Sequence, residues 1–133
     1  MLEAAAFAAT LAGRTALILG HEPALNALEA DLLRQIGAKH VIEISDVETA
    51  LASLNGVGFV FADPMAGGLT LLERIRANPA LARLPVMIVT SDTNPRVAIA
   101  AKKAGVSGLL ARPYRVETLA EHTQKALQRA AGV

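Results

Sequence analysis

Short apolar runs recur along the chain without the alternation that a half-exposed strand shows. Each is four or five residues long, and turn-forming or polar residues follow it. Runs of this kind are typical of strands that are buried on both faces of a sheet. The pattern predicts five strands, at residues Ala16–Leu19, Val41–Ile44, Phe59–Ala62, Val86–Thr90 and Gly108–Ala111.

Apolar residues between these runs return every three or four positions, which predicts amphipathic helices. Gly37 and Gly105 are natural helix stops, and Pro79 ends a third helix. Ser45 and Glu48 have the spacing of a capping box in front of another. The five predicted helices run from Leu25 to Ile36, Ala50 to Leu54, Leu69 to Ile75, Val97 to Ala101 and Val116 to about Arg129.

The order of elements is a strand followed by a helix, five times over. This order predicts an α/β fold, a doubly wound five-stranded parallel sheet with five helices on its two faces. Residues 15–133 form this predicted domain, and residues 1–14 are an N-terminal extension, either a short helix or a tail. Its small apolar residues share one helical face: Leu2, Ala5, Ala6, Ala9 and Ala12.

Composition narrows the class of protein further. Thirteen Lys and Arg against twelve Asp and Glu leave a net charge of +1, which argues against nucleic-acid binding. The absence of cysteine excludes disulfides, Cys-ligated zinc and iron–sulfur clusters. The longest uncharged stretch, residues 49–62, is too short to span a bilayer, and no basic segment precedes the apolar start of the chain. We therefore expect a cytoplasmic protein that does not enter a membrane.

The polar residues that follow the strands are the candidates for chemistry. Ligands of open parallel sheets bind outside the carboxyl ends of the strands, where Asp63, Thr90 and Arg112 fall. Each also has an ordinary interpretation as a turn former, a helix cap or a surface side chain. The set carries more weight than its members because all of them fall at one edge of the sheet.

Four segments together resemble the CheY-like receiver domain of bacterial response regulators, over almost the whole chain from Thr15 to Leu127. "LPVMIVTSD" (84–92) resembles the family's fourth strand and its hydroxyl residue. "AAKKAGVSGLLARPY" (100–114) resembles its "A..AGA.GYL.KPF" block. "GLTLLERIRANP" (68–79) and "LILGHEPALNALEADLLRQIGA" (17–38) resemble its third helix and its opening. The resemblance implies the flavodoxin-like fold and a place in two-component, or phosphorelay, signal transduction.

Residue by residue, the resemblance places Asp63 at the phosphoacceptor aspartate and Thr90 at the switch hydroxyl. Arg112 stands where the family has its active-site lysine, and Leu109 where it has the aromatic switch residue. Gly20 and His21 stand where the family has two acidic residues that hold Mg²⁺, and Glu22 matches the residue after that pair.

The departures from the family pattern predict a degenerate site. Gly20 has no side-chain ligand, and the imidazole of His21 suits Mg²⁺ poorly. The loop after Asp63 is shorter than the family's "D..MP.MDG" segment, and Arg112 can pair permanently with Asp63. We therefore expect a pseudo-receiver that acts through protein contacts, is not an enzyme, and has neither a catalytic residue nor a metal site or other cofactor.

Two alternatives remain open. In the first, Asp63 is a working phosphoacceptor that takes a phosphoryl group from a histidine kinase or phosphotransfer protein, with Mg²⁺. In the second, Gly20 and the pair Gly67-Gly68 present backbone N–H groups to a small anion or nucleotide. His21 is either a neighbour of Asp63 across the pocket, where it would titrate or bind a metal, or an exposed or capping residue.

The expected partners are other signalling proteins: a kinase, a phosphotransfer protein or a downstream target. The family's dimerisation face corresponds to the last strand and the two helices beside it, and the N-terminal segment offers a second route to a homodimer. The chain begins with Met1 and carries no output domain after its last helix, which favours a stand-alone protein.

Overall fold

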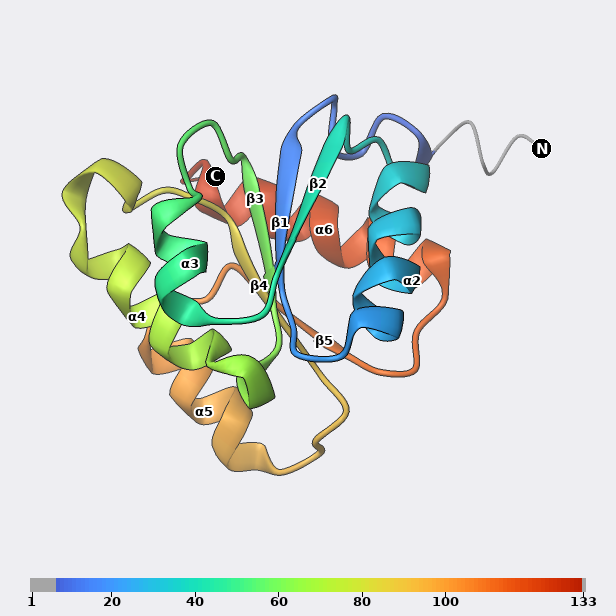
Figure 1. The fold of residues 1–133 in the computed structure, drawn as a ribbon. Coiled ribbons are helices and arrows are strands. Elements are labelled where there is room, and N and C mark those ends of the chain that lie inside the picture. The colour runs from blue at the N-terminus through green and yellow to red at the C-terminus, as the bar shows by residue number, and fades with distance from the viewer. Residues whose placement is uncertain (1–6, 133) are drawn as a thin grey trace.

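The computed structural model describes residues 7–132 and shows a single parallel sheet between two layers of helices (Figure 1). The five strands lie in the order β2-β1-β3-β4-β5. Their bounds are β1 Thr15–Leu19, β2 His40–Ile44, β3 Phe59–Ala62, β4 Val86–Thr90 and β5 Gly108–Ala111. The predicted strands are confirmed, with β1 and β2 each starting one residue earlier than expected.

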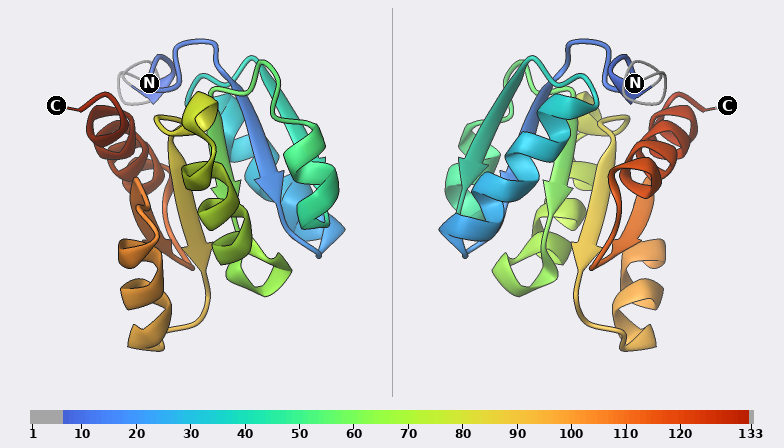
Figure 2. Two further views of the ribbon diagram at one scale, coloured as in Figure 1. Left: turned by 90° about the vertical axis from the view of Figure 1, so that its left-hand side faces the viewer. Right: turned by 90° about the vertical axis from the view of Figure 1, so that its right-hand side faces the viewer.

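The helices that connect the strands divide between the two faces. Figures 1 and 2 show α2 (Pro23–Gln35) and α6 (Val116–Ala130) on one face and α3 (Val47–Ala52), α4 (Gly68–Ala77) and α5 (Pro95–Lys103) on the other. Two short 3-10 turns, η1 (Pro64–Ala66) and η2 (Pro79–Leu81), flank α4. The predicted doubly wound α/β fold is confirmed.

Each face of the sheet has its own apolar core. Ile18, Phe59 and Phe61 pack with α2 and α6, whereas Leu17, Val60 and Ile88 pack with α3, α4 and α5. Successive residues of β1, β3 and β4 therefore point into opposite cores. This is why these strands lack hydrophobic alternation, and it stabilises the centre of the sheet that carries the candidate site.

Two details of the predicted helices are wrong. The N-cap of α3 is Asp46 rather than Ser45, because the Asp46 carboxylate accepts a hydrogen bond from the Thr49 backbone N–H at 2.9 Å. Its partner in the expected capping box, Glu48, points away and pairs with Arg74 at 3.2 Å. In α2, Leu28 lies on the expected apolar stripe, yet it is 58% exposed.

The segment before β1 packs against the first core. Leu11 is fully buried in it and Phe7 lies against it. The backbone N–H groups of Leu11 and Gly13 donate to the carbonyls of Ile36 and Gly37 at 2.8 and 2.9 Å. On the alanine face expected here, Ala9 and Ala12 are exposed, while Leu2, Ala5 and Ala6 lie outside the described residues.

None of the helices within residues 7–132 is both long enough and apolar enough to span a bilayer.

Candidate functional site

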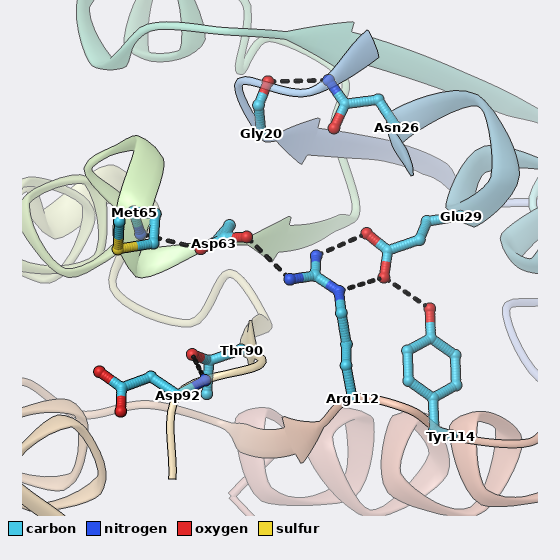
Figure 3. A network of polar contacts seen from close by, with 9 residues as sticks. All are labelled: Gly20, Asn26, Glu29, Asp63, Met65, Thr90, Asp92, Arg112 and Tyr114. Carbon is cyan, nitrogen blue, oxygen red and sulfur yellow. Dashed lines mark hydrogen bonds and ion pairs between the residues drawn. The ribbon is translucent and has the colours of Figure 1, made fainter. Parts of the chain in front are cut away.

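The candidate site lies at the edge of the sheet where the strands end (Figure 3). Asp63 follows β3, Thr90 ends β4 and Arg112 follows β5, so the parallel topology brings all three to one edge. Gly20 follows β1, next to β3 in the sheet. The expectation that these residues share an edge of the sheet is therefore met.

Arg112 is the centre of a buried ionic network. Its Nη1 donates to Asp63 Oδ2 at 2.8 Å, while Nε and Nη2 donate to the two carboxylate oxygens of Glu29 at 2.9 and 2.7 Å. The three side chains are only 12%, 11% and 2% exposed, in the order Arg112, Asp63, Glu29. One guanidinium thus holds two carboxylates, with the two-pronged geometry that arginine allows and lysine does not.

Tyr114 completes this network from the other side of Glu29. Its O–H donates to Glu29 Oε2 at 2.8 Å, and its ring meets Phe61 edge-on at 6.5 Å between centroids. Burial, followed by the negative charge of Glu29, raises the pKa of the Tyr114 phenol. Tyr114 is therefore a neutral hydrogen-bond donor at any ordinary pH.

The charge of Arg112 is equally fixed. Burial alone would lower the pKa of the guanidinium, but the hydrogen bonds and charges of Glu29 and Asp63 outweigh burial and raise it. Arg112 and Tyr114 therefore keep their protons, and both remain hydrogen-bond donors to the carboxylates of the network.

Both carboxylate oxygens of Asp63 already have partners. Oδ1 accepts the backbone N–H of Met65 at 2.8 Å, which makes Asp63 the N-cap of η1, and Oδ2 accepts from Arg112. Only Pro64 to Gly67 separate Asp63 from α4. The turn that follows β3 is thus tight, and it folds back on the carboxylate itself.

The positions after β1 do not supply ligands to Asp63. His21 and Glu22 are exposed, Glu22 is the N-cap residue of α2 without a side-chain cap, and no hydrogen bond joins either side chain to another described residue. The proposed neighbour contact between His21 and Asp63 is not formed. The Gly20 carbonyl accepts the side-chain amide of the buried Asn26 at 2.7 Å, and a Cβ on Gly20 would overlap that amide.

The two remaining site candidates stand apart from the network. Thr90 Oγ1 accepts the backbone N–H of Asp92 at 2.9 Å and shapes the turn after β4. No hydrogen bond between residues 7 and 132 links its hydroxyl to Asp63 or Arg112, and Figure 3 shows the gap. Leu109, on β5, is half-buried against the second core.

Comparison with known proteins decides the family. No protein-family model matches the chain. The chain is 31% identical over 121 residues to the chemotaxis protein CheY of Pseudomonas aeruginosa, which covers 87% of this chain and 98% of the relative. It is 33% identical over 118 residues to CheY-3 of Vibrio cholerae, covering 85% and 91%. The chain belongs to the CheY-like receiver family.

Solved structures agree with the receiver assignment. A putative response regulator from Chloroflexus aurantiacus is similar with a TM-score of 0.79 and 26% identity, over 87% of this chain and 98% of that one. The signal receiver domain of a histidine kinase from Syntrophus aciditrophicus has the same fold, with a TM-score of 0.75, 20% identity and coverage of 87% and 91%. This chain is therefore a receiver domain of two-component signalling.

The glycines of this receiver do not form the anion cradle that the sequence allowed. The N–H of Gly20 donates to the Ile44 carbonyl, that of Gly67 to Pro64 and that of Gly68 to Asp63, at 2.9 to 3.1 Å. The Gly20 group thus joins the end of β1 to β2, and those of Gly67 and Gly68 hold the turn after β3. Gly67 also has a φ of 96°, a left-handed conformation that a glycine adopts without strain.

Glu29 and Asn26 are the residues of this receiver's site that the sequence analysis missed. Glu29 lies four residues after Leu25 and three before Leu32, within the apolar stripe of α2. A carboxylate in such a stripe is a signal for a buried ion pair. Its partner, Arg112, is 83 residues away, so no local pattern connects the two.

Replacing Tyr114 by Phe tests the outer part of the network. The free energy of unfolding is expected to fall by about 1–2 kcal/mol, because Glu29 loses one charged hydrogen bond but keeps Arg112. Urea unfolding measures the change. A loss below about 0.5 kcal/mol would show that water replaces the phenol and that Tyr114 is no part of the network.

Proposed function

We propose that this receiver acts through protein contacts and without Mg²⁺-dependent phosphorylation of Asp63. The observation that carries the proposal is the Arg112 guanidinium, which is bound at once to Asp63 and to Glu29. In this arrangement a permanent internal cation neutralises Asp63. The protein is then a binding module rather than an enzyme, and it requires no cofactor.

The side chains around Asp63 do not fit a Mg²⁺ ion. This hard cation requires several oxygen ligands in near-octahedral geometry. Gly20 offers no side chain and its carbonyl is used by Asn26, while both oxygens of Asp63 are occupied. Nowhere in residues 7–132 do three His, Cys, Asp or Glu side chains gather as a metal site would require.

The switch positions support the same proposal. Thr90 is engaged with its own turn rather than with Asp63. Leu109 is an aliphatic residue packed against the second core, and it lacks the polar ring edge by which an aromatic residue could follow a moving hydroxyl. Both features favour one fixed conformation, to which a partner would bind directly.

The experiment that tests this function exposes the protein to beryllofluoride or acetyl phosphate with millimolar Mg²⁺. Amide NMR signals near Asp63, Thr90 and Arg112 are followed, with Asp63→Asn as the control. We expect no saturable shift in either protein. A saturable shift that is lost in Asp63→Asn would overturn the proposal and establish the alternative, a working phosphoacceptor.

Partner identification follows from the same proposal. Signalling proteins, among them kinases, phosphotransfer proteins and downstream targets, are the class in which a pull-down should find the partner. Self-association through β5 and its flanking helices α5 and α6, or through the N-terminal segment, is a separate possibility. Sedimentation of the full chain, and of the chain without residues 1–6, distinguishes the two routes, and the shorter chain keeps Phe7 and Leu11 in the first core.

A further inference from the structure

Two adjoining hollows lie toward the edge of the sheet where the strands begin, and the larger one also extends along the edge strand β5 to Leu109 and His122. The smaller, about 150 Å³, is lined by Arg76, Arg83 and Arg129. The larger, about 410 Å³, is lined by Lys102, Lys125 and again Arg129. Both hollows share the wall formed by residues 106 and 107. Figure 2 shows the ends of α4 and α6 together at this edge, at the upper end of the molecule.

The described residues that line these hollows include cations but no carboxylate. The side chains of Arg83, Lys102, Lys125 and Arg129 form no hydrogen bond or ion pair with another residue between 7 and 132. The whole chain carries only +1, so this concentration does not follow from a basic composition.

Arg76 adds a fixed cation at the floor of the smaller hollow. It donates to the carbonyls of Gly105 and Leu84 at 2.8 and 2.7 Å and to Ser107 Oγ at 3.1 Å, with a weaker contact to the Ala82 carbonyl at 3.3 Å. All four acceptors are neutral, and burial lowers the pKa of the guanidinium. One of its five N–H groups remains for a ligand. A half-buried cation without a counter-charge is stabilised when an anion binds next to it.

Helix dipoles account for only part of this arrangement. Arg76, Lys102 and Arg129 lie in the last turns of α4, α5 and α6, where cations are favourable. Each helix end supplies about half an elementary negative charge, which is less than the charge of the side chain beside it. Arg83 and Lys125 lie outside these last turns. The dipoles therefore leave most of the positive charge unbalanced.

We propose that the two hollows bind a small molecule that carries two linked phosphate groups. Arginine matches phosphate with paired N–H donors, and lysine binds it as a point charge. The smaller hollow accommodates one phosphate beside Arg76, Arg83 and Arg129, and the lysine-lined hollow takes the second phosphate and the rest of the molecule. The larger volume lies within the range of small-molecule sites, about 300–1,000 Å³.

Inorganic pyrophosphate is the probe for this site. Amide NMR of Gly105, Val106 and Ser107 should show saturable shifts in the full-length protein. The double variant Arg83→Gln/Arg129→Gln should bind pyrophosphate at least about tenfold more weakly, since each of these exposed arginines would donate a charge-assisted hydrogen bond to a phosphate of the ligand. A control variant, Arg34→Gln/Arg96→Gln, removes the same charge elsewhere on the surface and should bind within about twofold of the unaltered protein.

Each possible result decides the proposal. Pyrophosphate binding that exceeds the binding of single phosphate supports it, and tighter binding of a nucleoside diphosphate assigns the larger hollow to the nucleoside. Absence of saturation, or an equal loss in the control variant, shows diffuse charge attraction and overturns it. Saturation by an acidic peptide but not by pyrophosphate also overturns it and assigns the surface to a protein partner.

Discussion

Replacing Glu29 by Ala is expected to lower the free energy of unfolding by about 3–5 kcal/mol. Glu29 is 2% exposed, and it receives hydrogen bonds from Nε and Nη2 of Arg112 and from Tyr114. Its removal leaves Arg112 with Asp63 as its only carboxylate partner in the described chain, and it opens a small cavity. Removal of one partner from a buried ion pair is costly because the remaining charge stays desolvated.

Urea unfolding followed by circular dichroism measures this loss. Glu73→Ala is the matched control, because Glu73 is an exposed helix residue and its removal should change stability by no more than about 0.5 kcal/mol. The triple variant Glu29→Met/Asp63→Asn/Arg112→Met should recover a large part of the loss, since it removes all three charges of the network and leaves none of them unpaired. A loss below about 1 kcal/mol for Glu29→Ala would show that water reaches Arg112 and that the network is not a closed ionic core.

Restoring carboxylates after β1 is expected to create affinity for Mg²⁺. The triple variant Gly20→Asp/His21→Asp/Asn26→Ala adds two carboxylates to the turn after β1, the strand next to β3, and removes the amide that occupies the space next to Gly20. We expect Mg²⁺ to bind at least about tenfold more tightly than to the unaltered chain, because hard oxygen ligands are then grouped as this cation requires.

NMR titration with Mg²⁺ provides the measurement. Asn26→Ala alone should not gain affinity, and adding Asp63→Asn to the triple variant should remove most of the gain. If the triple variant binds Mg²⁺ no better than the unaltered chain, the ion pair between Arg112 and Asp63, rather than the absence of acidic residues after β1, prevents metal binding. Adding Arg112→Lys to the triple variant then tests whether that ion pair is the cause.

The network has a consequence for how this receiver can signal. A phosphoacceptor must exchange partners when it is modified, whereas Asp63 is held by Arg112 and by the Met65 N–H at the same time. If Arg112 moved away from Asp63, it would also disturb Glu29, a buried residue of α2, and Tyr114, whose ring packs on Phe61. Any change at Asp63 therefore involves the first core of the domain. This dependence supports the proposal that partners bind a single, stable conformation of the receiver.

The sequence by itself determined the fold of this protein and the edge of the sheet at which the site lies. Unalternating runs such as Phe59–Ala62 and Val86–Thr90 are typical of strands buried on both faces, and the βα order then predicts a parallel sheet. Parallel strands bring their carboxyl ends to one edge, so Asp63, Thr90 and Arg112 were predictable as neighbours. Local hydrogen bonding was less predictable. Ser45 and Asp46 are both residue types that cap helices, and Asp46 is the N-cap because α3 begins at Val47.

Only the tertiary structure decided which side chains meet. Glu29 and Arg112 are 83 residues apart, and they meet only because the chain after β5 brings Arg112 within hydrogen-bond distance of α2. The cations that line the two hollows come from three helices and a loop, so no single segment of the sequence shows that they lie together. The physical reason is the same in both cases. Periodicity reports which face of an element is buried, whereas pairing of charges depends on distances between elements that are set by core packing.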